Sequence, residues 1–116
     1  MARRDPTVRM RHMPAHAREA RSMAEGRTRS DLDTDRPLCL SLTWLVGMVG
    51  EAASHVPPEA RARCPAIPWK AIVAMRHRLI HGYDVIDYDL LWEAVALHLP
   101  PLIAELERIL EPEGQA

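Results

Sequence analysis

The sequence contains no phenylalanine, and its aromatic residues, three Trp and two Tyr, make up only 4% of the chain. Alternating runs of Val, Ile, Thr and aromatic residues, which are typical of β-strands, are also missing. These absences argue against a β-sandwich or a β-barrel. What remains is a series of apolar residues at helical spacing, so we expect an all-α protein.

Cysteine and long apolar runs are scarce as well. Cys39 and Cys64 are too few for a disulfide framework and lack a close-spaced partner for a zinc site, so we expect two buried thiols. No apolar run approaches the roughly 18 residues of a membrane span. No apolar stretch follows the basic start at Arg3–Arg4, as it would in a secretory signal. These features predict a cytoplasmic protein that makes no contact with a membrane.

A chain of 116 residues, 47% hydrophobic and 27% charged, fits one globular domain spanning residues 1–116. Its net charge of −1 conceals a strong asymmetry. Residues 1–29 hold eight Arg against three acids, residues 59–83 hold five cations against one Glu, and residues 84–116 hold eight acids against one Arg. The basic segments could share a face that binds an anion, or acidic and basic helices could neutralise each other; charge alone leaves both open.

Four segments carry the apolar spacing of helices, which predicts an antiparallel bundle of four to five helices. The first is expected to begin at Asp5–Pro6, to kink at Pro14 and to stop at Gly26. Residues 26–36 are polar and rich in turn formers, so we expect a loop there. The second helix is expected from Pro37 to Ser54.

The second helix combines one apolar face with two glycines. Gly47 and Gly50 each weaken a helix by about 1 kcal/mol relative to Ala, so they predict that another backbone comes close. The apolar face is formed by five residues that recur at intervals of three and four: Leu38, Leu42, Leu45, Val46 and Val49.

The third and fourth helices have clear end signals. Pro68 is expected to open the third helix and Gly82 to follow its end. Asp87 is expected to cap the start of the fourth, which should kink or break at Pro100–Pro101. The tryptophans lie in apolar patterns and are expected in the core: Trp44, Trp69 and Trp92.

The end of the third helix concentrates polar groups capable of chemistry: Arg76, His77, Arg78, His81 and Tyr83. The helix dipole favours cations at a helix C-terminus, which explains one or two of these residues as solvated caps. That explanation does not cover the whole group, so a functional site is the better hypothesis.

Cleavage of RNA without a metal requires these residue types. A base takes the 2′-hydroxyl proton, an acid protonates the leaving oxygen, and a cation stabilises the charged phosphorane. Histidine titrates near neutrality, and the planar guanidinium of arginine stays charged beside a phosphate. On one continuous helix Arg76 and His81 would lie about 140° apart, so we expect a second copy of the helix across a two-fold axis to complete the site.

The chain resembles the HepT-like toxins of the HEPN superfamily along nearly its whole length. The family motif is Arg, four to six residues, His, any residue and Tyr, and here it reads Arg76, four residues, His81, Gly82, Tyr83. His77 stands where the family often has Asn or Asp. The neighbouring blocks follow in the same order: Asp5-Pro6, Gly50-Glu51-Ala52-Ala53, Ile67-Pro68-Trp69 and Asp87-Tyr88-Asp89-Leu90-Leu91-Trp92.

The resemblance implies a HEPN-like helical homodimer whose paired motif helices line a cleft. It implies a metal-independent endoribonuclease that cuts single-stranded RNA as the toxin of a type VII toxin–antitoxin system. Arg76 and His81 would be catalytic, with His77, Arg78 and Tyr83 as substrate-binding residues. The enzyme itself would need no cofactor.

The same resemblance implies a partner, a minimal nucleotidyltransferase antitoxin called MNT. It would use ATP to attach AMP to Tyr83 and so silence the toxin. The simpler alternative is that Tyr83 stacks on an RNA base or packs against Trp92. A different class of function also stays open: a non-catalytic nucleotide- or substrate-binding subunit of a minimal nucleotidyltransferase.

Other residues are assigned structural roles. His77 and His81 have the spacing of metal ligands on a helix, but no third ligand is evident and the adjacent arginines would repel a cation, so we expect no metal. His12 and His16 have the same spacing with Pro14 between them. The remaining candidates are expected at the surface, at a helix end or in packing: His55, His98 and Tyr88.

Overall fold

The computed structural model describes residues 8–81 and 85–110. It is a helical bundle, which confirms the predicted all-α class. The helices are α1 (Val8–Ala24), α2 (Asp31–Thr34), α3 (Arg36–Ser54), α4 (Pro58–Ala62), α5 (Trp69–Leu79), α6 (Tyr88–Glu93), η1 (Ala94–His98) and α7 (Leu99–Leu110). Two short strands, β1 (Ile80–His81) and β2 (Val85–Ile86), follow α5.

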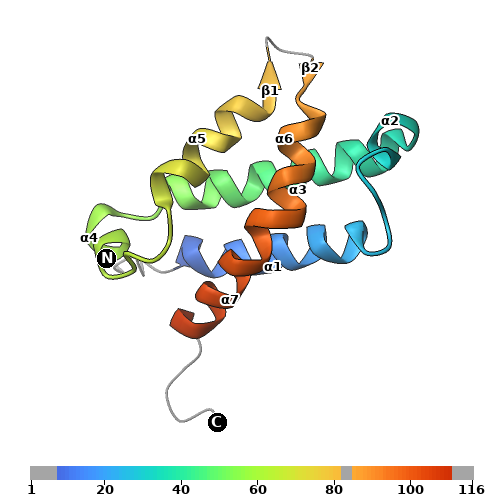
Figure 1. The fold of residues 1–116 in the computed structure, drawn as a ribbon. Helices are drawn as coiled ribbons and strands as arrows, with labels where there is room; N and C mark the ends of the chain where they lie inside the picture. The colour runs from blue at the N-terminus through green and yellow to red at the C-terminus, as the bar shows by residue number, and fades with distance from the viewer. Residues whose placement is uncertain (1–7, 82–84, 111–116) are drawn as a thin grey trace.

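Helix α3 lies at the centre of the bundle. It packs antiparallel to α1 on one side and against α5 on another, while α6, η1 and α7 cross both long helices (Figure 1). The predicted apolar face of α3, from Leu38 to Val49, is buried in the core. Helix α3 is long enough for a membrane span and has a mean hydropathy of 1.2, whereas we expected no segment of that kind from the sequence. Half of this stretch is buried among the other helices.

The predicted helix boundaries hold where a side chain caps the helix. Asp35 accepts a hydrogen bond from the backbone N–H of Leu38 at 3.0 Å and starts α3, and Asp87 accepts one from Leu90 at 2.9 Å and starts α6. Helix α1 ends at Ala24, and Gly26 follows with a φ of 74°, as its predicted stop requires. The expected start at Asp5–Pro6 lies outside the described residues.

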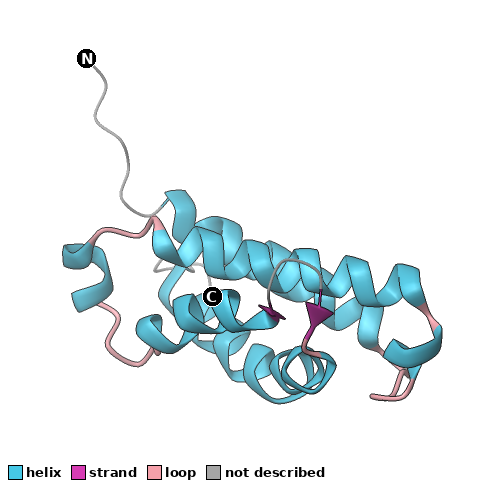
Figure 2. Ribbon diagram, turned by 90° about the horizontal axis from the view of Figure 1, so that it is seen from above, coloured by secondary structure: helices cyan, strands magenta, loops and turns pink. Residues whose placement is uncertain are grey.

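Two expectations about local structure were wrong or incomplete. Helix α5 ends at Leu79, because the backbone N–H of Asp87 donates to its carbonyl at 2.8 Å and the chain turns into β1. Ile80 pairs with Ile86 and His81 with Val85, so a small antiparallel hairpin replaces the last helical turn (Figure 2). The short helix α2 occupies part of the segment expected to be a loop.

Pro100 and Pro101 neither break nor end the fourth helix. Instead, the backbone N–H of Leu99 reaches the carbonyl of Ala94, and residues 94–98 form a π-helical turn. Proline has no N–H, so the carbonyl of Val95 has no helical donor at Pro100. The Arg21 guanidinium on α1 donates to that carbonyl at 3.1 Å instead. The π turn therefore lets the helix continue into α7.

Most of the expected packing is confirmed. Cys39 and Cys64 are buried free thiols, and Trp69 is buried. Trp44 was expected in the core, but 57% of it is exposed, because α3 is apolar on more sides than its neighbours cover. The partly buried residues Trp92 and Tyr88 pack against the core.

Candidate functional site

Arg76 lies on the last turn of α5 and packs against α3 at Gly50. A Cβ atom added to Gly50 would lie 2.7 Å from Cβ of Arg76 and 3.3 Å from the carbonyl oxygen of Ile72. The absence of a side chain at Gly50 therefore makes room for the stem of Arg76. The predicted close approach is confirmed at Gly50, whereas an added Cβ at Gly47 would meet nothing within 4 Å.

The guanidinium of Arg76 is held by an ion pair. Its Nη2 lies 2.7 Å from Oε1 of Glu51, the residue that follows Gly50, and both side chains are 37% exposed. This contact uses one corner of the guanidinium fork. The fork carries five N–H donors, so donors remain for a second anion such as a phosphate.

The backbone of His81 lies in β1, just beyond the end of α5. The expected angle of about 140° between Arg76 and His81 assumed one continuous helix, and that assumption is wrong. For the same reason His77 and His81 do not share a helical face, so the metal-ligand spacing does not apply to them. Gly82 and Tyr83 lie outside the described residues.

His77 and Arg78 are exposed near the end of α5, and neither forms a hydrogen bond or ion pair within residues 8–81 and 85–110. Two positions along a helix correspond to a rotation of about 200°. Arg78 therefore projects away from the contact between Arg76 and α3. The structure does not bring Arg78 to Arg76.

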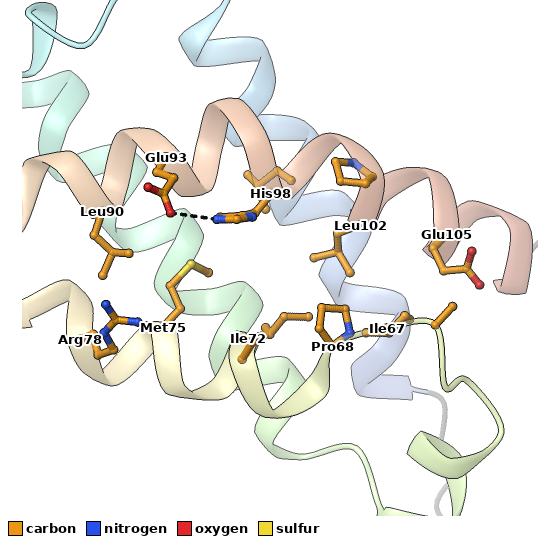
Figure 3. A pocket seen from close by; sticks show the side chains of 14 residues that line it. Ile67, Pro68, Ile72, Met75, Arg78, Leu90, Glu93, His98, Leu102 and Glu105 are labelled. Carbon is orange, nitrogen blue, oxygen red and sulfur yellow. Dashed lines mark hydrogen bonds and ion pairs between the residues drawn. The ribbon is translucent and has the colours of Figure 1, made fainter.

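Arg78 instead lines a pocket of about 420 Å³ between α5 and the helix formed by α6, η1 and α7. Apolar side chains line it from both walls, among them Ile72 on α5 and Leu102 on α7 (Figure 3). Figure 3 shows Arg78 at one end, and Glu93 paired with His98 on the opposite wall. Nε2 of His98 lies 3.1 Å from Oε1 of Glu93, a contact across five residues that the π turn permits.

The two basic segments differ in how their charges are compensated. In the N-terminal segment, Arg18 pairs with Glu107, Arg27 with Asp35 and Arg29 with Asp89. Hydrogen bonds from Arg29 to the carboxylates of Asp89 and Asp33 raise the pKa of Arg29 above its ordinary value, and the bond to Asp89 is the largest cause. Three arginines of this segment are thus neutralised by carboxylates, and of these only Arg18 pairs from one helix to another.

In the second basic segment, residues 59–83, four of the five cations form no ion pair within the described ranges: Arg61, Arg63, Lys70 and Arg78. Of the described residues, no group of three His, Cys, Asp or Glu is arranged to hold a metal ion. The candidate site is therefore built from arginine, histidine and one carboxylate.

The role of Glu51 was not foreseen from the sequence. Glu51 belongs to one of the blocks shared with the HepT-like toxins, but its partner lies 25 positions away on another helix. The only local signal was Gly50, which predicted a close approach without naming the neighbour. His55, assigned to the surface or to a helix end, also lies beside this carboxylate, with its Nδ1 3.5 Å from Oε2 of Glu51.

Comparison with known proteins identifies the family of the chain. The model of the family described as ribonuclease HepT-like matches residues 13–109. A protein of Caldanaerobacter subterraneus subsp. tengcongensis, whose RNase name is provisional, is 32% identical over 83 residues, which cover 72% of this chain and 74% of that protein. The "Probable ribonuclease HepT" of Thermococcus cleftensis is 30% identical over 79 residues, covering 68% and 72%.

No solved structure matches the chain significantly. The matched segment nevertheless contains α3, α5 and α6, and with them Glu51, Arg76 and His81. The family model spans most of the chain, and the two relatives are 32% and 30% identical over more than two thirds of their own lengths. Together these matches establish the family. The chain is a member of the HepT-like ribonuclease family.

Proposed function

We propose that this protein is a metal-independent endoribonuclease that cleaves single-stranded RNA as the toxin of a type VII HEPN/MNT pair. Its membership in the HepT-like ribonuclease family supports the RNA-cleaving chemistry. The observation that carries the proposal is the position of Arg76, which Glu51 holds at 2.7 Å while the rest of the guanidinium stays open. A pure docking protein has no need of an arginine fixed in this way.

In the proposed reaction, Arg76 binds the non-bridging oxygens of the scissile phosphate and stabilises the charge that develops on the phosphorane. His81 transfers a proton to or from a reacting oxygen, which suits a group with a pKa near neutrality. His77 and Arg78 bind the RNA outside the scissile phosphate, since they are exposed on other sides of α5. No step in this scheme needs a metal ion.

We propose that the active form is a homodimer in the cytoplasm. Two large apolar side chains of α3 are exposed four residues apart, Leu40 at 45% and Trp44 at 57%. The open space at Gly47 continues this apolar face by one further turn. Exposed apolar faces of this kind are typical of subunit contacts.

The proposed regulation is transfer of AMP from ATP to Tyr83 by an MNT-type nucleotidyltransferase. The added phosphate would bring negative charge and bulk against the cations that bind RNA. The reading frame beside this gene offers an independent check. A small nucleotidyltransferase with a Gly-Ser and paired-Asp signature encoded there would support the pairing.

The test of this function is cleavage of single-stranded RNA by the purified, unmodified protein in the presence of EDTA. Arg76→Ala and His81→Ala should each lower the rate by about 10²- to 10⁴-fold, the usual contribution of a positioned acid–base or charge-stabilising group. If the protein cleaves no RNA, or if both variants cleave normally, the enzyme proposal fails. The alternative is then a non-catalytic binding subunit of a minimal nucleotidyltransferase.

A further inference from the structure

We propose that His55 is a second catalytic histidine of the RNA-cleaving site, the general base that takes the proton of the 2′-hydroxyl group. This inference rests on the proposed ribonuclease function. It starts from a histidine that shares one carboxylate with Arg76. His55 lies outside the motif, at the C-terminal cap of α3.

One carboxylate joins His55 to Arg76. Oε1 of Glu51 lies 2.7 Å from Nη2 of Arg76, and Oε2 lies 3.5 Å from Nδ1 of His55. The guanidinium and the imidazole therefore lie against the two oxygens of the same carboxylate. This arrangement places the imidazole and the guanidinium close enough to act on one phosphodiester.

The hydrogen bonds around His55 determine its neutral tautomer. Nδ1 lies 2.9 Å from the backbone carbonyl of Glu51, which can only accept. It also lies 3.2 Å from Oγ of Ser54, whose hydroxyl donates to the same carbonyl at 2.7 Å. Nδ1 must therefore carry the proton. The lone pair of neutral His55 is then on Nε2, which has no hydrogen-bond partner within residues 8–81 and 85–110.

The end of α3 is a fixed platform for this ring. The backbone N–H of His55 bonds to the carbonyls of Ala52 and Ala53, so it does not occupy the Glu51 carbonyl, which accepts from Nδ1 and from the Ser54 hydroxyl. Arg61 on α4 donates to the carbonyls of Ala53 and Val56, at 3.0 Å each. The charged groups around His55 are thus Glu51 on its own helix, Arg76 on α5 and Arg61 on α4.

The proposed step balances without any further reactant. Nε2 of neutral His55 takes the 2′-hydroxyl proton, and the 2′ oxygen forms a bond to phosphorus with the electron pair it keeps. The bond from phosphorus to the 5′ oxygen breaks with its electron pair, and the 5′ oxygen takes a proton from protonated His81. Glu51 stabilises the imidazolium that forms on His55, as a carboxylate does in other acid–base pairs.

A simple capping role explains the Nδ1 contact of His55 but not its position. A cap needs only the carbonyl of Glu51, whereas the side-chain carboxylate of Glu51 also places His55 beside Arg76. The ring is 51% exposed, so its Nε2 is open to a substrate.

The experiment compares His55→Gln with His98→Gln. His98 is a matched control, since it is also half-exposed at 56% and paired with a glutamate, but it lies in the pocket away from Arg76. His55→Gln should lower kcat/KM by about 10²- to 10⁴-fold, and the rise of kcat/KM on the acidic side of the pH profile should disappear. His98→Gln should leave both unchanged, and both variants should keep the wild-type unfolding midpoint.

A substrate with a 5′-bridging sulfur separates base from acid, because a thiolate leaves without protonation. On this substrate His81→Ala should recover most of its activity, whereas His55→Gln should stay impaired. Recovery of His55→Gln on the sulfur substrate would overturn the base role, as would normal cleavage and a normal pH profile of His55→Gln. In both cases RNA cleavage that depends on Arg76 would keep the proposed function intact. If the wild-type protein cleaves no RNA, the proposed function fails and this inference fails with it.

Discussion

Arg76 crosses Gly50 so closely that a methyl group on Gly50 would lie 2.7 Å from its Cβ. Real Cβ atoms do not approach that near, and the clash would involve the stem of Arg76 rather than its flexible end. The contact sets the separation of α3 and α5 and directs the guanidinium to Glu51. The geometry of the candidate site therefore depends on a residue that has no side chain.

Gly50→Ala should destabilise the fold and lower activity. The new methyl group must push α5 away from α3, and overpacking of this kind costs about 1 to 3 kcal/mol. Gly47→Ala is the matched control on the same helix, where nothing lies within 4 Å and the gain in helix propensity is about 1 kcal/mol. Denaturant unfolding measures both. Equal stabilisation by the two substitutions would show that the close approach is absent.

Glu51→Gln should lower RNA cleavage by about 100-fold, because loss of the charge releases Arg76 from its position and misplacement by about 1 Å costs that much. Glu59→Gln, which changes an acidic residue in the first turn of α4, is the control and should cleave normally. Thermal unfolding should be nearly the same for both, since the ion pair of Glu51 is partly exposed. Full activity of Glu51→Gln would refute a positioning role.

The sequence predicts the helices well, because their signals are local. The N-cap Asp87 and the apolar face of α3 both depend on residues within a few positions of each other. The end of α5 does not. It is set by the pairing of Ile80 with Ile86 and by a hydrogen bond from Asp87, which local spacing does not reveal.

The sequence predicts only part of the candidate site, because the rest depends on contacts between residues far apart in the chain. The motif identifies Arg76, but its partner Glu51 is on another helix and is found only from the packing. The exposure of Trp44 is also a tertiary property, since its apolar surroundings in sequence fit burial equally well. The π turn before Pro100 is a third case, because it depends on Arg21 from α1.

Trp44→Glu should convert the proposed dimer into a monomer. A charge in the centre of an apolar contact loses its hydration without gaining a partner. Light scattering should give about 26 kDa for the wild type, twice the chain mass of 13.1 kDa. Leu97→Glu, at a residue 65% exposed on η1, should stay dimeric. A wild-type mass of one chain at micromolar concentration would contradict the dimer.

Tyr83 should gain AMP when the protein is incubated with its cognate nucleotidyltransferase and ATP. Intact mass would show the addition, and peptide mapping would locate it. The modified protein should lose RNA cleavage, because the new phosphate competes with RNA for the same cations. Modification of another residue, or silencing that persists in Tyr83→Phe, would place the switch elsewhere.

The most direct test of the account is the identity of the RNA ends that the wild-type protein produces in EDTA. Attack by the 2′-hydroxyl group, with Arg76 stabilising the phosphorane, predicts a 2′,3′-cyclic phosphate on one product and a 5′-hydroxyl on the other. A single 2′-deoxy substitution at the cleaved position should abolish the cut there. Products with a 5′-phosphate, cleavage of the 2′-deoxy substrate, or activity that is lost in EDTA would contradict the account.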